Sequence, residues 1–125
     1  MKILIVEDVK AMAMAAKAIV SLAKHEVDIA ATPTEAKKAV SNNSYDAIFM
    51  DFGLPEMDGL KLTSILRSEG YMGLIIGLTA NSELFTLEQM KAAGLNACLE
   101  KPLSPIKLSL LEKDPNSMYF DLEFD

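Results

Sequence analysis

Residues 45–59 read Tyr-Asp-Ala-Ile-Phe-Met-Asp-Phe-Gly-Leu-Pro-Glu-Met-Asp-Gly, and this stretch carries the main signals for the fold. The run from Ala47 to Met50 is continuously apolar, which is typical of a strand in a parallel sheet that is covered on both faces. Asp51 stands where this run ends, and a turn-rich segment then leads to Gly59. The stretch therefore predicts a buried strand with a carboxylate at its carboxyl end.

Four similar runs rich in Ile, Val and Leu lie before and after this one, at residues 3–6, 27–31, 74–78 and 97–99. Segments of helical composition follow the runs, over residues 9–24, 34–41, 59–69, 84–93 and 104–113. The strand and helix patterns alternate five times. We therefore expect an α/β fold with a doubly wound, five-stranded parallel sheet, strand order 2-1-3-4-5, and helices on both faces.

Local signals support several helix ends. Ser104 precedes Pro105, which suits the cap and first position of a helix. Gly94 stands where a left-handed helix ending is expected, and Asp114-Pro115 should stop the last helix.

Length and composition bound the class of protein. With 125 residues, half of them apolar, the chain fits one domain, and no apolar run approaches the length of a membrane span. The single Cys98 and single His25 exclude an intramolecular disulfide and a Cys/His zinc site, which suits a reducing cytoplasm. A net charge of −6 argues against direct nucleic-acid binding. We expect a cytoplasmic protein without a membrane or nucleic-acid partner.

We expect one folded unit over residues 1–113 and an acidic, aromatic tail over residues 114–125. The tail is interpreted either as a surface segment or as a docking strand or helix for a partner. Met1 directly precedes the first strand, which favours a free-standing protein over a piece of a longer chain.

Polar residues stand at the ends of four predicted strands: Glu7 and Asp8, Asp51, Thr79, and Lys101. In this fold the carboxyl ends of the strands form the ligand crevice. Three carboxylates brought together repel one another unless a cation compensates, and their hard oxygens suit Mg²⁺. A carboxylate there can attack phosphorus to form an aspartyl phosphate, whose oxygens Lys101 and Thr79 would bind. Taken singly, each residue could instead be a helix cap, a loop acid or a surface charge.

Four features, in this order and spacing, resemble the receiver domains of two-component response regulators. They are Glu7-Asp8, the segment from Met50 to Gly59, Thr79-Ala80, and Lys101-Pro102. The resemblance runs from Met1 to about Lys113.

The resemblance implies that Glu7, Asp8, Asp51 and the backbone carbonyl of Gly53 bind Mg²⁺. It implies that Asp51 is phosphorylated from a sensor histidine kinase or a histidine phosphotransfer protein, and that Thr79 and Lys101 respond to the phosphate. Output would then pass to a downstream protein target. The bond before Pro102 would be cis, as in the family.

Two departures from the family pattern stand out. Cys98 occupies the position where an aromatic residue usually takes part in signalling, so the signal would pass through the fourth helix and its loop, with Phe85 as a candidate substitute. Gly53, two residues after Asp51, offers no side chain to affect the water that hydrolyses the phosphate, whereas Asn81 is a candidate for that influence.

Two other readings remain. An aspartyl-phosphate phosphatase needs a second acid two residues after its nucleophile, and Gly53 stands there, so we expect no enzyme activity beyond the chain's own phosphorylation and dephosphorylation. The other reading is a docking module that is never phosphorylated.

His25 has no predicted partner, and Met12 and Met14 are expected to be packing residues of the first helix.

Overall fold

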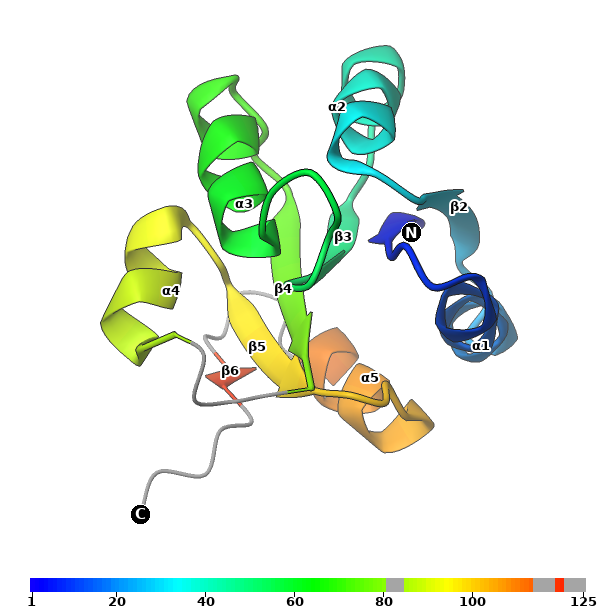
Figure 1. Ribbon diagram of the computed structural model, residues 1–125. Coiled ribbons are helices and arrows are strands. Elements are labelled where there is room, and N and C mark those ends of the chain that lie inside the picture. Colours follow the sequence, from blue (N-terminus) through cyan, green and yellow to red (C-terminus); the bar gives the residue numbers. More distant parts are fainter. Residues whose placement is uncertain (81–84, 114–118, 121–125) are drawn as a thin grey trace.

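The computed structural model describes the backbone of residues 1–80, 85–113 and 119–120, and the side chains of residues 1–80 and 85–109. Strands and helices alternate along this chain (Figure 1). The elements are β1 (Lys2–Val6), α1 (Lys10–Leu22), β2 (Glu26–Ala30), α2 (Pro33–Asn42), β3 (Ala47–Asp51), α3 (Gly59–Ser68), β4 (Leu74–Thr79), α4 (Leu87–Ala93), β5 (Ala97–Glu100), α5 (Pro105–Lys113) and β6 (Tyr119–Phe120).

The first five strands form a parallel sheet in the order β2-β1-β3-β4-β5, which confirms the predicted topology. β3 lies at the centre, and all five of its residues are buried. β2 lies at an edge and is mostly exposed, which agrees with its alternation of acidic and apolar residues. Continuous apolar sequence thus marks the strands that have neighbours on both sides.

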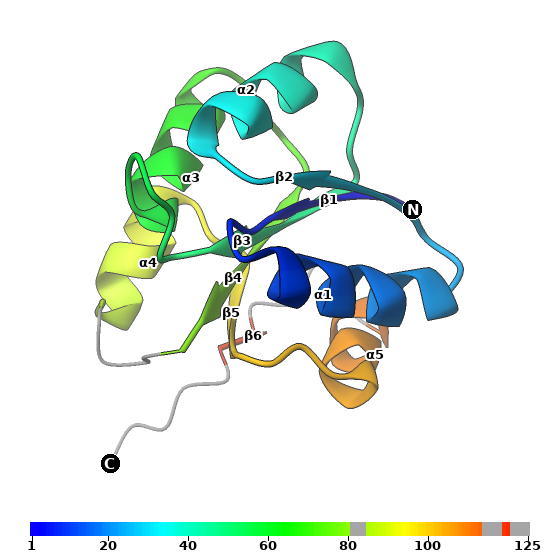
Figure 2. The same ribbon diagram turned by 45° about the vertical axis from the view of Figure 1, so that its right-hand side comes forward.

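Helices cover both faces of the sheet, as the sequence predicts. α1 and α5 lie on one face, and α2, α3 and α4 lie on the other (Figures 1 and 2). Alternate residues of β3 enter different cores: Phe49 packs in the cluster that includes α1 and α5 residues, whereas Ile48 and Met50 pack in the cluster beneath α2, α3 and α4. The sheet is therefore buried on both faces over its central strands.

Several predicted helix ends are confirmed. Gly94 has a φ of 104° and caps α4 in the left-handed region. The hydroxyl of Ser104 accepts a hydrogen bond from the Lys107 amide at 3.2 Å, just before α5 begins at Pro105. α5 ends at Lys113, and the expected stop at Asp114-Pro115 lies outside the described residues.

Two predictions about helices were wrong. α4 begins at Leu87, whereas helical composition predicts a start at Leu84, a residue outside the described part of the chain. Thr86 forms a capping box with Gln89 and fixes this start, because the Thr-x-x-Gln pattern satisfies two backbone amides reciprocally. Met12 and Met14 are 39% and 51% exposed, so they are surface residues of α1 and do not fill the core.

A sixth strand extends the sheet beyond the five that the sequence predicts. The two residues of β6 pair in parallel with β5, with Ala97 opposite Tyr119 and Cys98 opposite Phe120. Residues 114–118 and 121–125 of the predicted tail lie outside the described residues. Among the described residues, no helix is long and apolar enough to span a membrane.

Candidate functional site

The register of the central strands brings Glu7 and Asp51 to the same edge of the sheet. Val6 of β1 pairs with Met50 of β3. The residues that follow them, Glu7 and Asp51, therefore stand at the carboxyl ends of adjacent strands. The Glu7 amide donates to the carbonyl of Ala30 at 3.0 Å, which holds the segment after β1 in line with β2. The sheet itself therefore positions the two acids.

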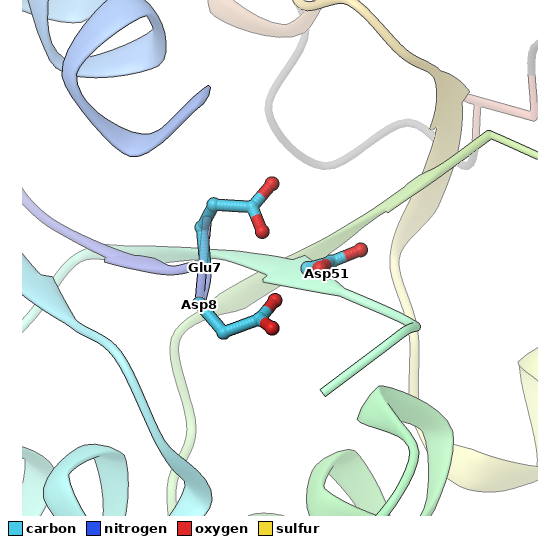
Figure 3. Close-up of side chains that lie close together, drawn as sticks. All are labelled: Glu7, Asp8 and Asp51. Carbon is cyan, nitrogen blue, oxygen red and sulfur yellow. The ribbon is translucent and has the colours of Figure 1, made fainter. Parts of the chain in front are cut away.

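The three predicted acids form one cluster. One carboxylate oxygen from each of Glu7, Asp8 and Asp51 lies within 4.8 Å of the other two, and the three side chains lie close together (Figure 3). Glu7 and Asp51 are buried, whereas Asp8 is exposed. Two acids therefore come from the end of β1 and one from the end of β3.

Lys101 reaches this cluster from the end of β5. Its Nζ lies 2.7 Å from Oε1 of Glu7 and 2.9 Å from Oδ1 of Asp51. The Lys101 amide donates to the carbonyl of Thr79 at 2.8 Å, and the bond to Pro102 is cis, as the sequence analysis predicts. One ammonium thus contacts the two buried carboxylates.

The pKa values of the two buried acids shift in opposite directions. Burial raises the pKa of Glu7 above its ordinary value, in spite of its hydrogen bond with Lys101, and the contact with Asp51 raises it further. Burial alone would also raise the pKa of Asp51, but hydrogen bonds with Lys101, Glu7 and the Gly53 amide outweigh it and leave the pKa lowered. Of the two buried acids, Glu7 is therefore the more easily protonated and Asp51 the more readily ionised.

The ion pairs also change Lys101. Burial would lower the pKa of this ammonium group, but its hydrogen bonds with Asp51 and Glu7 prevail and leave the pKa raised. Lys101 is therefore a fixed positive charge beside Asp51 at neutral pH.

A hollow of about 300 Å³ opens over the cluster and is lined by Asp8, Asp51, Thr79 and Lys101 together with Gly53. Thr79 is buried at the end of β4. Gly53 donates its amide to Oδ1 of Asp51 at 3.2 Å, and a Cβ at this glycine would meet no atom within 4 Å. The hollow therefore stays open above the carboxylate of Asp51.

The donors in this hollow fit a hard divalent cation. Three carboxylates converge, and one ammonium cannot neutralise all of them, so a bound Mg²⁺ would relieve their repulsion. The carbonyl role predicted for Gly53 stays a prediction, as do the separate roles of Thr79 and Lys101.

The structure explains why the segment from Met50 to Gly59 ends in a glycine. Gly59, the first residue of α3, packs against the backbone of Asp51 so closely that a Cβ would collide with the Asp51 carbonyl. Its amide also donates to the Phe52 carbonyl at 3.1 Å. Gly59 therefore lets α3 start directly against the strand end that carries Asp51. In the sequence, the Asp58-Gly59 pair at the start of a predicted helix is the pattern that could have indicated this role.

The remaining predicted residues lie away from the carboxylates. His25 lies beside β2 at the other end of the sheet, where its Nδ1 is 3.1 Å from the amino group of Met1. Cys98 is buried in β5, and Phe85 packs against the core just before α4. Asn81 lies outside the described residues.

Comparison with known proteins gives one consistent family. The family described as the response regulator receiver domain matches residues 3–111. The receiver domain (CheY-like) from Methylobacillus flagellatus is 27% identical with a TM-score of 0.82, covering 90% of this chain and 95% of that one. The receiver domain of sensor histidine kinase PA1611 from Pseudomonas aeruginosa PAO1, solved with magnesium in its active site cleft, is 31% identical with a TM-score of 0.79 and coverage of 88% and 92%.

Curated relatives are much longer than this chain. The sensor protein EvgS of Escherichia coli (strain K12) is 36% identical over 104 residues, which is 83% of this chain and 9% of EvgS. The chain spans 9% to 15% of the length of EvgS and of the plant histidine kinases that it also matches. The similarity therefore concerns one domain of those proteins.

Proposed function

Because the chain belongs to the response regulator receiver domain family of two-component systems, we propose that Asp51 accepts a phosphoryl group in the presence of Mg²⁺. The donor is a sensor histidine kinase or a histidine phosphotransfer protein. One observation carries the proposal: the Asp51 carboxylate lies 2.9 Å from a lysine ammonium and within 4.8 Å of two further carboxylates, under an open hollow.

The residues around Asp51 divide the work of phosphoryl transfer. An oxygen of the Asp51 carboxylate attacks phosphorus, a new P–O bond forms, and the bond from phosphorus to the donor nitrogen breaks. The lowered pKa of Asp51 keeps this nucleophile ionised. The incoming phosphoryl oxygens take over the ammonium of Lys101 and meet the Thr79 hydroxyl, because transfer of this group depends on positioning and on charge stabilisation.

Glu7, Asp8, Asp51 and the Gly53 carbonyl would hold the Mg²⁺, which would supply charge compensation for the transferring group. The raised pKa of Glu7 makes protons stronger competitors with the cation for this carboxylate. Metal affinity should weaken as the pH falls.

Residues 1–113 are the switch in this proposal, and residues 114–125 are its acidic, aromatic tail, of which residues 119–120 pair with β5. Output passes to a downstream protein, since a net charge of −6 gives little attraction for nucleic acid. A cytoplasmic location suits the single cysteine. Gly53 supplies no general acid, so turnover of external substrates is not part of the function.

Intact-mass analysis with a small-molecule phosphodonor tests the proposal. We expect wild type to gain one phosphoryl group when Mg²⁺ is present, and Asp51→Asn to gain none under the same conditions. Asp46→Asn is the matched control, because Asp46 is an exposed acid at the other end of β3 and an amide oxygen can still accept its hydrogen bond from Lys2. A wild type that takes no phosphoryl group, or an adduct that persists in Asp51→Asn, would contradict the proposal.

A further inference from the structure

Phe52, the residue after Asp51, places its aromatic ring against the neighbouring strand β4. Phe52 is buried, and its ring lies against Gly77, so close that a Cβ at Gly77 would be 2.6 Å from Cε1 and 2.7 Å from Cζ of the ring. A glycine within a strand weakens it and often marks a close approach by another group. Gly77 in the middle of β4 is therefore explained by the space that the Phe52 ring needs.

The neighbouring strand also offers little bulk at this point. Gly77 is in register with Cys98 of β5, and Cys98 is fully buried in the same cluster as Phe52. Two small residues on adjacent strands thus leave room on the face of the sheet that α3 and α4 cover. An aromatic side chain delivered from β3 occupies this region.

Phe52 is paired with a second ring that stands at the start of α4. The ring centroids of Phe52 and Phe85 are 5.5 Å apart and the planes meet at 79°, an edge-to-face contact of the kind that aromatic pairs favour. Phe85 directly precedes Thr86, the N-cap of α4. It also lines a hollow of about 400 Å³ between α3 and α4, so its ring has space for a second position.

The opposite end of α4 is fixed by other contacts. Arg67 near the end of α3 donates from Nε to the carbonyl of Gly94, the C-cap of α4, at 3.0 Å. Its terminal nitrogens donate to the Tyr71 and Gly73 carbonyls and to Asn96. α4 is therefore anchored at its C-terminal end, while its N-terminal end meets the core through Phe85.

We infer that the Phe52–Phe85 ring pair couples the state of Asp51 to the N-terminal end of α4. The inference rests on the proposed phosphorylation of Asp51. Phe52 is covalently joined to Asp51, and Phe85 follows Thr79 by six residues, so both sides of the ring contact lead back to groups that face the phosphoryl site. Phosphorylation separates the rings, Phe85 moves into the hollow between α3 and α4, and α4 pivots about the end that Arg67 holds.

Amide hydrogen exchange of residues 87–93, measured with and without phosphodonor and Mg²⁺, tests the inference. In wild type, phosphorylation should change exchange in α4 by about fivefold or more, a typical lower bound for coupling between sites. Phe85→Leu and Phe52→Leu should still gain the phosphoryl group, yet lose most of this response. Phe85→Tyr, which keeps a ring at the contact, should retain it.

Phe49→Leu is the matched control, because Phe49 is also a buried phenylalanine at β3 but faces the opposite core. It should lower stability and leave the response of α4 intact. The inference is overturned if α4 responds fully in both Phe52→Leu and Phe85→Leu, or if Phe49→Leu abolishes the response equally. A wild type that gains no phosphoryl group in the same mass measurement overturns the proposed function and this inference with it, whereas phosphorylated variants that still respond overturn this inference alone.

Discussion

Two partly buried cations lie at opposite ends of the sheet and are held in opposite ways. Lys101, at the carboxyl ends of the strands, contacts the carboxylates of Glu7 and Asp51. Arg67, at the amino ends of β4 and β5, donates four hydrogen bonds of 2.7 to 3.0 Å to the neutral oxygens of Gly94, Tyr71, Gly73 and Asn96. The first cation sits in a cluster that still has excess negative charge, and the second sits among acceptors that it satisfies.

The difference distinguishes a site that can bind a ligand, at Lys101, from a structural contact, at Arg67. An incoming cation or phosphoryl group has something to gain at Lys101, because the three acids repel one another and a hollow stays open above them. At Arg67 the planar guanidinium fills its neighbours' hydrogen-bonding needs and joins α3 to the segments before β4 and β5. Substitutions at the two ends should therefore differ in size and in their response to Mg²⁺.

The largest effect on stability should come from Arg67→Met. Removing the guanidinium breaks four hydrogen bonds, although Oδ1 of Asn96 still accepts from the Ile75 amide. At about 1 kcal/mol for each bond, the free energy of unfolding should fall by about 3 to 4 kcal/mol. Urea denaturation with and without Mg²⁺ measures this loss, which should be the same in both conditions. Arg67→Lys, which keeps a charge but loses the planar fork, should recover only part of it. A loss that Mg²⁺ reverses would break the comparison, since it would tie Arg67 to the acidic cluster.

A smaller effect is expected from Lys101→Met, and Mg²⁺ should reverse it. Removing the ammonium leaves buried carboxylates facing each other. Because the raised pKa of Glu7 makes its protonation easier, we expect a cost of about 2 kcal/mol, below that of breaking a fully buried pair. Urea denaturation in a chelator should show the loss, and saturating Mg²⁺ should restore most of it. Lys38→Met, an exposed lysine of α2, is the control and should change little under either condition.

The pH dependence of the stability of Lys101→Met tests the repulsion between the acids more directly. Without Lys101 the pKa of Glu7 in the folded state should rise further above its unfolded value. A carboxyl with a raised folded pKa opposes folding while it is ionised, and this penalty fades as the pH falls through that folded pKa. In a chelator the deficit of Lys101→Met should therefore shrink toward acidic pH; a deficit that grows instead would contradict the repulsion between the acids.

The sequence predicts the acidic cluster around Lys101 much better than the contacts around Arg67. Apolar runs predict the strands, and five alternating strand-helix units predict a doubly wound sheet and its strand order. A fold with that order brings the strand ends together, so Glu7, Asp51, Thr79 and Lys101 could be expected at one edge. The positions of these residues agree with that expectation. Their chemical roles stay predictions that the mass and metal measurements decide.

Features that depend on packing were not predictable in the same way. Arg67 looks like any charged residue near a helix end, and only the tertiary structure shows which carbonyls surround it. The apolar character of Met12 and Met14 predicts packing, but the two residues are 39% and 51% exposed on α1. Thr86 and Gln89 carry the signal for the observed start of α4, whereas helical composition alone extends the predicted helix to residue 84. The pairing of residues 119–120 with β5 has no strong local pattern.

The smallest expected effect concerns Tyr71, which packs beside Arg67. Burial raises the pKa of Tyr71 to about 12, and the nearby Arg67 charge lowers it only in part. Its hydroxyl donates to the Tyr45 carbonyl at 3.1 Å, so Tyr71→Phe should cost about 1 kcal/mol at neutral pH through the lost hydrogen bond. Because the folded pKa lies above the ordinary value near 10, this contribution is complete below about pH 10 and is lost as the pH rises toward 12.

Rapid-mixing absorbance of tyrosinate after a pH jump measures this ionisation before the chain unfolds. The difference between wild type and Tyr71→Phe should show a step near pH 12, and in the Arg67→Met background that step should move higher, because the cation that favours tyrosinate is gone. A step near pH 10 would mean that Tyr71 is solvated and not buried beside Arg67. The end of the sheet that contains Arg67 would then no longer be the satisfied counterpart of the acidic cluster, and the contrast between the two cations would rest on the carboxylates alone.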